Sequence, residues 1–135
     1  MAVTNTDNQA ISLKKRIRKL NKISQPFREK GYCPTKDFLA GSTDKWSLLC
    51  IYNLAYFEQM RFNELKNAIN DISARMLSLT LKKLEQNKIV IREVFPESPP
   101  RVEYSLTNFG LELADRLSVL TNWIIENSER LKEME

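Results

Sequence analysis

Residues 73–87 read SARMLSLTLKKLEQN, and this stretch decides the fold. Ser73 is a residue type that favours the N-cap of a helix, so a helix is predicted to begin at the next residue and to run through the rest of the stretch. Three leucines, Leu77, Leu81 and Leu84, recur at steps of four and three residues. That spacing places them in one stripe, which is predicted to be buried.

A shorter helix is predicted immediately before this one. Asn63 is expected to cap it, and its apolar side chains, Phe62, Leu65 and Ile69, are expected to face inward. The Asn-Asp pair at residues 70–71 supplies a turn. Two adjacent helices joined by a short turn form a helix-turn-helix.

The pattern changes from helical to strand-like after the helix-turn-helix. Residues 89–95 are rich in β-branched side chains, and residues 96–100, PESPP, form a stiff turn. In the second strand Val102, Tyr104 and Leu106 alternate with more polar neighbours, as in a hairpin with one buried face. A two-stranded hairpin is marginal alone, so it must pack on the helices as a wing.

The remaining elements are also predicted to be helices. A short one covers residues 35–40, a longer one covers about residues 45–57 with Asp44 as its N-cap, and Thr107 caps a last helix that runs past Asn127. The fold class is therefore mainly α with a small β-hairpin (α+β): a winged helix-turn-helix with a long C-terminal helix.

The last helix carries more apolar surface than one face of a terminal helix needs, and this excess suggests a partner chain. We predict a homodimer whose contact is formed by six apolar residues of this helix: Phe109, Leu113, Leu117, Leu120, Trp123 and Ile124.

The composition argues against catalysis. The chain has 135 residues, no histidine and only three glycines, so it lacks the commonest general base and metal ligand and any glycine-rich phosphate loop. We predict no enzymatic activity, no cofactor and no metal site. No apolar run is long enough to span a membrane, and the polar N-terminus lacks a signal-peptide core, so we expect a cytoplasmic protein.

Charge is distributed unevenly along the chain. Residues 1–31 hold eight basic and two acidic residues, a net charge of +6, whereas residues 32–135 hold 13 basic and 15 acidic residues, a net charge of −2. We therefore divide the chain into a basic N-terminal extension, residues 1–31, and a winged-helix domain, residues 32–135. Nucleic-acid binding cannot be argued from the overall charge and must be argued from the position of individual cations.

The chain resembles the HxlR family of bacterial winged-helix transcriptional regulators over about residues 33–128. Five blocks carry the resemblance: Cys33-Pro34, residues 44–49 (DKWSLL), residues 61–65 (RFNEL), residues 72–77 (ISARML) and residues 99–107 (PPRVEYSLT). The resemblance implies a homodimer that binds DNA and regulates a promoter, often its own. Two features depart from the family pattern: the basic stretch at residues 11–23 is extra, and Asn87-Lys88 stands where an acidic residue and glycine are usual.

If the three leucines face the core, the opposite side of their helix faces outward and fits the major groove. Its residues expected to contact DNA are Ser73, Ala74, Arg75, Met76, Ser78, Leu79, Lys82 and Lys83. Arg75 is expected to donate two hydrogen bonds to guanine, and the two lysines are expected to hold phosphates.

Cations outside this helix extend the predicted DNA contact. Arg61 and Lys66 of the preceding helix are phosphate candidates. Arg101 lies at the wing tip, where it either enters the minor groove or pairs with Glu97 or Glu103.

The basic extension leaves several roles open. Residues 1–10 are polar and expected to be disordered, residues 11–23 have the spacing of a basic amphipathic helix, and Pro26 suggests a linker over residues 24–31. The basic stretch is an arm along DNA phosphates, a helix that packs its apolar face on the dimer partner, or a disordered tail.

The two cysteines are expected to differ. Cys50 lies on the apolar face of a predicted helix and is expected to be a buried core residue. Cys33 lies at the start of a predicted helix, with Lys30 and Lys36 nearby in sequence. The family resemblance implies a thiol that senses oxidants or electrophiles at Cys33, and an inert cysteine is the alternative.

Together these features predict a sequence-specific regulator of transcription that binds double-stranded DNA. It is expected to act as a homodimer on a palindromic or pseudo-palindromic operator and to be responsive to redox conditions or electrophiles through Cys33. The alternative is a winged-helix protein-interaction module without specific DNA binding. The sequence marks no pocket for a small-molecule effector.

Overall fold

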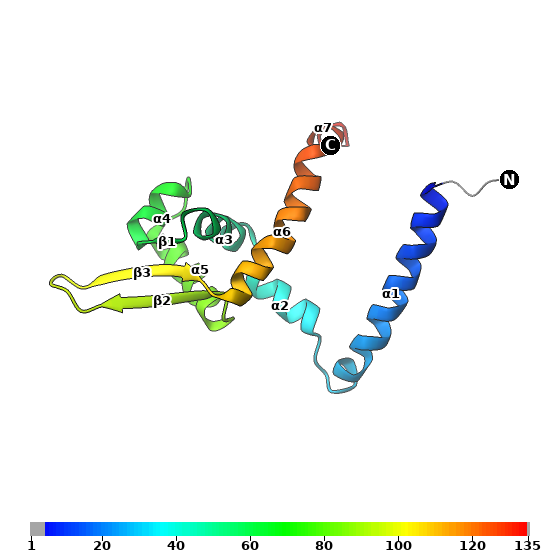
Figure 1. Cartoon of the computed structure of the whole chain (residues 1–135), viewed down its shortest axis with the longest axis horizontal. Coiled ribbons are helices and arrows are strands. Elements are labelled where there is room, and N and C mark those ends of the chain that lie inside the picture. Colours follow the sequence, from blue (N-terminus) through cyan, green and yellow to red (C-terminus); the bar gives the residue numbers. More distant parts are fainter. Residues whose placement is uncertain (1–4, 135) are drawn as a thin grey trace. The chain divides into compact units, whose positions relative to one another are not determined.

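The computed structural model describes residues 5–134, which belong to two units: one ends at Leu39 and the other begins at Ala40 (Figure 1). α2 (Pro34–Ser42) spans the division between them. None of the helices within the described residues is long and apolar enough to cross a membrane.

The first unit is dominated by α1 (Asn5–Glu29), a single helix that is longer than predicted. Disorder over residues 1–10 is wrong for residues 5–10, and residues 1–4 lie outside the described part of the chain. The predicted linker over residues 24–31 is also wrong, because the helix continues through Pro26.

Pro26 lies in the last turn of α1, so its missing N–H group and its ring disturb only the end of the helix. The helix then closes with paired hydrogen bonds around Gly31, whose φ is 75°. Tyr32 N–H donates to the Phe27 carbonyl and Gly31 N–H donates to the Arg28 carbonyl, both with N···O distances of 2.9 Å. This is a Schellman motif, in which glycine is favoured at the residue with positive φ.

The second unit has the predicted order of elements, with additions. After α2 come α3 (Lys45–Phe57), β1 (Gln59–Met60), α4 (Phe62–Ala68), α5 (Ala74–Gln86), β2 (Val90–Phe95), β3 (Arg101–Leu106), α6 (Asn108–Glu126) and α7 (Ser128–Glu133). α4 and α5 form the helix-turn-helix, and β2 and β3 form a long hairpin whose tip extends beyond the helices (Figure 1).

The sheet has three antiparallel strands in the order β1-β3-β2 rather than the two that were predicted. β1 pairs Gln59 with Ser105 and Met60 with Tyr104. Two residues are too short to show an alternating pattern, so the sequence carries no signal for β1. Its pairing ties the start of α4 to the wing.

The predicted leucine stripe is the centre of the core. Leu77, Leu81 and Leu84 of α5 are all at most 2% exposed, and they pack with the buried residues of α3. The other buried apolar residues come from every layer of this unit: Cys50, Ile51, Leu54, Met60, Leu65, Ile69, Ile72, Ile89, Val90, Leu106, Ala114 and Leu117. One continuous core therefore holds the helix-turn-helix, the base of the wing and α6 together.

Three predicted N-caps are confirmed and one is wrong. The side chains of Asp44, Ser73 and Thr107 each accept a backbone N–H three residues ahead. α4 begins at Phe62 with Arg61 as its N-cap, two residues before the predicted cap at Asn63. Glu64 explains the difference, because its carboxylate accepts the Arg61 N–H at 3.1 Å and stabilises the earlier start.

The C-terminal helix does not run past Asn127 as predicted. Asn127 is the C-cap of α6, and α7 is a separate helix. The Asn127 side-chain amide donates to the Trp123 carbonyl at 2.8 Å. Such a local side-chain hydrogen bond competes with the helical backbone pattern and favours a break.

Candidate DNA-binding surface

The start of α5 is set by Ser73, whose hydroxyl accepts the Met76 N–H at 3.0 Å. Ahead of it, Asp71 adopts a φ of 66° in the turn from α4. Aspartate tolerates this left-handed conformation better than most residues do. The turn and the cap together fix the direction in which the first turn of α5 points.

All but one of the residues predicted to contact DNA along α5 are exposed, and the exception is Lys83. The exposed residues are Ser73, Ala74, Arg75, Met76, Ser78, Leu79 and Lys82. Leu79 is 53% exposed, although leucine is usually buried. Thr80 is turned inward and its hydroxyl donates to the Met76 carbonyl at 2.7 Å. The helix therefore separates a buried leucine side from an open side led by Arg75.

Lys83 is placed differently from Lys82. Its ammonium lies 2.5 Å from the Asp44 carboxylate, across from α5 to the N-cap of α3. Partial burial acts to raise the pKa of Asp44, but the hydrogen bonds from Lys83 and Ser47 outweigh it and lower this pKa to about 2. Lys83 thus ties two core helices together, and Lys82 remains the exposed cation of the pair.

The two cations of α4 lie on either side of its first turn. Arg61 is exposed, and its side chain is free of the capping interaction that its backbone makes with Glu64. Lys66 is half-buried in the last turn of the helix. Both belong to the helix that precedes α5, which in helix-turn-helix proteins crosses the DNA backbone.

Arg101 at the wing is held by its own strand neighbours. Its guanidinium lies 3.4 Å from the carboxylates of both Glu97 and Glu103. It also stacks on Phe95, 4.1 Å from the ring centroid. Both acidic neighbours that the sequence pointed to are therefore paired with Arg101.

Sequence reasoning missed Arg92, an exposed residue of β2 that stands opposite Tyr104 on β3. Arg92 and Tyr104 line one side of an open cleft of about 280 Å³, and α5 lines the other side with Ser78 and Lys82. The cleft thus brings a wing cation beside a cation of α5. The signal in the sequence was weak, because Arg92 interrupts a run of apolar strand residues without a motif.

One side of α6 exposes large apolar side chains beyond the part of the helix that packs on its own subunit. Gly110, Ala114 and Leu117 are buried. Four of the predicted dimer residues are between 42% and 55% exposed: Phe109, Leu120, Trp123 and Ile124. Of the other two predicted dimer residues, Leu113 is half-buried and Leu117 is buried in the core of its own subunit.

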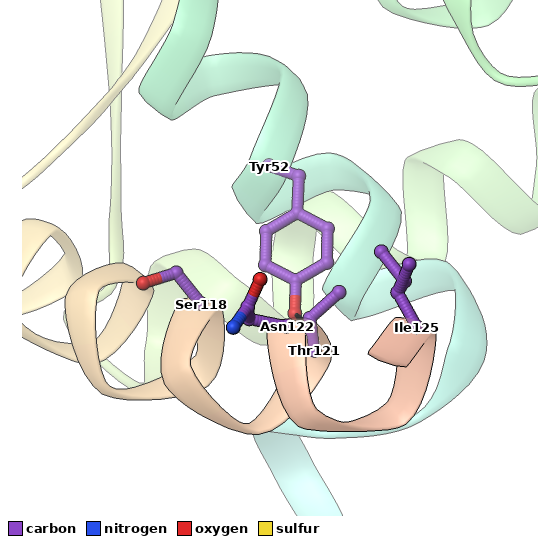
Figure 2. Close-up of a pocket in the computed structure, with 5 residues that line it drawn as sticks. All are labelled: Tyr52, Ser118, Thr121, Asn122 and Ile125. Carbon is purple, nitrogen blue, oxygen red and sulfur yellow. Dashed lines mark hydrogen bonds between the residues drawn. The ribbon is translucent and has the colours of Figure 1, made fainter. Parts of the chain in front are cut away.

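Tyr52 anchors α6 to α3, a role that the sequence did not reveal. Its hydroxyl donates to the Leu117 carbonyl at 3.3 Å and shares a hydrogen bond with the Thr121 hydroxyl. Figure 2 shows the Tyr52 ring standing over α6 in an open cleft of about 270 Å³, beside Ser118, Asn122 and Ile125. The contact fixes the angle at which α6 leaves the domain.

The cysteines differ as predicted in burial. Cys50 is fully buried in the core, and burial raises the pKa of its thiol to about 12, with the Asp44 charge adding to the effect. Cys33 is half-buried, and both thiols are free. Within the described residues, no three Cys, Asp or Glu side chains gather as metal ligands would.

Comparison with known proteins agrees with this architecture. Residues 42–132 match the family model for the HxlR-like helix-turn-helix. The HTH-type transcriptional regulator YdeP of Bacillus subtilis is 35% identical over 103 residues, which cover 76% of this chain and 80% of YdeP. BH0655, an HTH-type transcriptional regulator of Halalkalibacterium halodurans, is 42% identical over 83 residues, covering 62% of this chain and 74% of that protein.

Solved structures show the same likeness. The redox regulator HypR in its reduced form superposes with a TM-score of 0.68 at 36% identity, covering 74% of this chain and 98% of HypR. The diamide-treated form of YodB from B. subtilis gives a TM-score of 0.61 at 35% identity, covering 70% of this chain and 93% of YodB. Together with the winged helix-turn-helix fold, these matches show that the chain belongs to the HxlR-like helix-turn-helix family and is a transcriptional regulator of that family.

Proposed function

We propose that this regulator binds double-stranded DNA in the cytoplasm as a homodimer, without enzymatic activity, with α5 of each subunit in a major groove. The observation that carries the proposal is the two-sided character of α5. Leu77, Leu81 and Leu84 are buried. The opposite side of the helix exposes Arg75, Ser78, Leu79 and Lys82. A major groove admits one helix, and residues near the N-terminus of a recognition helix reach the base edges.

Within this arrangement the residues divide by chemistry. Arg75 reads guanine, whereas Ala74, Met76 and Leu79 supply apolar contacts for thymine methyl groups. Lys82, Arg61 and Lys66 are placed for phosphates. Arg92 joins this group from the wing side of the cleft with Lys82.

The dimer is proposed to form through α6. Phe109, Leu120, Trp123 and Ile124 expose large apolar side chains on one side of this helix. A soluble monomer rarely exposes a contiguous apolar surface of this kind. Two-fold symmetry of the dimer then predicts a palindromic or pseudo-palindromic operator, with half-sites separated by one helical turn or a multiple of it.

The DNA test starts from duplexes selected from a random library and from DNA upstream of the protein's own coding sequence. Arg75→Ala should lose the discrimination between selected and random DNA, because one bidentate base contact supplies roughly 5- to 150-fold. Arg130→Ala is the matched control, since Arg130 is exposed on α7 and donates a hydrogen bond to the Asn127 side chain. Retention of wild-type specificity by Arg75→Ala would refute the recognition-helix assignment.

The dimer test is analytical ultracentrifugation of Leu120→Asp beside Leu111→Asp. Both leucines are about half exposed on α6, but only Leu120 belongs to the proposed contact. The first variant should sediment as a monomer and the second as a dimer. A monomeric wild-type protein, or equal behaviour of the two variants, contradicts the proposed interface.

We also propose that Cys33 makes DNA binding responsive to oxidants or electrophiles. Cys33 is the more accessible of the two free cysteines, whereas Cys50 is buried with a raised pKa. The similar protein HypR is a redox regulator. Iodoacetamide should modify Cys33 much faster than Cys50 in the folded protein. Diamide should change the DNA affinity of the wild type and leave that of Cys33→Ser unchanged, and an equal response of both proteins would exclude Cys33.

A further inference from the structure

We propose that α1 is a second DNA-contacting element, whose basic face lies along the phosphate backbone of the duplex that the winged helix occupies. The inference rests on the proposed DNA binding and adds a site to it. It concerns a segment that precedes the part of the chain matching the family model, which begins at residue 42. Similarity to known regulators therefore does not account for α1.

The helix separates its side chains into two faces. At about 100° per residue, five cations fall within an arc of about 140°. These are Lys14, Lys15, Arg18, Lys19 and Lys22. Five of the six exposed large apolar residues of α1, between 42% and 59% exposed, fall within an arc of about 120° on the opposite side: Leu13, Ile17, Leu20, Ile23 and Phe27. The sixth, Ile11, lies on the side of the cations, one turn before the first of them. The two arcs exist in the structure because residues 5–29 form one continuous helix. A helix here also rules out the disordered tail, one of the three roles considered for the segment.

The basic face is not neutralised within the part of the chain that the structure describes, where no ion pair involves any of its five cations. Glu29, the nearest acidic residue at the end of the helix, accepts a hydrogen bond from the Gln25 amide. In the winged-helix domain, by contrast, Lys83, Arg101 and Arg116 all pair with acidic side chains. The strongest concentration of available positive charge is therefore on α1.

DNA fits this face better than a second copy of α1 does. Arg16 falls within the apolar arc and Arg28 borders it, so apolar pairing of two α1 helices would bring like charges together. Membrane-surface helices also place Lys and Arg opposite Leu and Phe, so a membrane is the competing occupant of α1, and the DNA-binding family domain joined to α1 favours the duplex. The connection between α1 and α2 is short, because only residues 30–33 separate the two helices. A short tether raises the effective concentration of α1 at bound DNA to the millimolar range, on the order of 1 mM, so that weak phosphate contacts are occupied.

The test compares the full-length wild type with the triple variant Lys15→Gln/Arg18→Gln/Lys22→Gln. Glutamine keeps the helix, which circular dichroism verifies, and removes three charges from the basic face. Each lost phosphate contact should lower the slope of log affinity against log salt by about 0.9. For one engaged α1, the triple variant should therefore lose about 40-fold less affinity than the wild type between about 50 and 200 mM salt. Its preference for operator over random DNA should remain.

The matched control removes three exposed charges outside α1 and outside the proposed DNA and dimer residues, as Lys45→Gln/Arg130→Gln/Lys132→Gln in α3 and α7. This variant should keep the wild-type salt slope. An unchanged slope for the α1 variant overturns the inference, and so do equal effects of the two triple variants. Binding of the wild type to equimolar phosphatidylserine–phosphatidylcholine vesicles that the α1 variant loses, with DNA binding unaffected, also overturns it. Failure of the proposed function is recognised separately, because Arg75→Ala would then leave operator preference unchanged.

Discussion

The two adjacent lysines of α5 provide the sharpest test of the division between stability and DNA contact. Lys83 lies 2.5 Å from the Asp44 carboxylate, with both side chains between one third and two fifths exposed, whereas Lys82 lies in the exposed cleft with Arg92. Lys83→Gln should therefore destabilise the fold and leave DNA affinity nearly unchanged. Lys82→Gln should do the reverse.

The size of the stability effect follows from the exposure of the pair. Solvent-accessible ion pairs contribute up to about 1 kcal/mol after screening, and this pair lies at the upper end because Asp44 also caps α3. A loss of about 1 kcal/mol should lower the melting temperature by roughly 3–5 °C in a protein of this size. Lys82→Gln should leave the melting temperature unchanged and should lower the salt slope of DNA binding by about 1 per subunit.

The effect of Lys83→Gln should depend on pH in one direction. The pKa of Asp44 is lowered to about 2 in the folded state, below its value of about 4 in an unfolded chain. A lowered carboxyl pKa stabilises the fold at pH values above the unfolded pKa, and this contribution disappears as pH falls through the folded pKa. The difference between wild type and Lys83→Gln should thus be constant from pH 7 to about pH 4 and vanish near pH 2.

Thermal unfolding by circular dichroism and DNA binding by fluorescence anisotropy measure the two effects. A double-mutant cycle with Asp44→Asn isolates the pair, since asparagine keeps the N-cap. The reasoning is refuted if Lys83→Gln melts like the wild type and weakens DNA binding as much as Lys82→Gln does.

Three further outcomes are expected. Arg92→Gln should reduce the salt slope of DNA binding, measured by anisotropy, more than Arg101→Gln, because Arg101 is paired with acidic neighbours; equal slopes would contradict this. Lys88→Gly should raise the melting temperature by a few degrees, corresponding to about 0.5–1 kcal/mol, because Lys88 has a φ of 62° that glycine adopts without strain; an unchanged or lower melting temperature would argue against it. Gly110→Ala should destabilise the protein by about 1–3 kcal/mol in urea unfolding, because its Cβ would lie 2.2 Å from the Ile89 carbonyl oxygen, and a neutral result would show that α6 can shift.

The order of elements and the buried stripe of α5 could be predicted from sequence because they depend on local signals. Leucine spacing, the caps at Asp44, Ser73 and Thr107, and the change to an alternating pattern in the wing each act within a few residues. Such local signals also predicted which side of α5 is open. The errors at α1 and at Asn127 arose where local signals conflicted, because a proline in a last turn and an asparagine in a helix each allow more than one outcome.

The sequence predicted one part of the DNA-binding surface, and the tertiary structure decided the rest. The sequence by itself determined that a cationic helix face exists and that Arg75 leads it. Only the tertiary structure decided which cations remain unpaired and can contact DNA, because ion pairs form between residues far apart in the chain. Lys83 pairs across 39 positions with Asp44, and Arg92 meets Lys82 only where the wing folds beside α5. Charges that look alike in a sequence acquire different roles from the neighbours that folding brings to them.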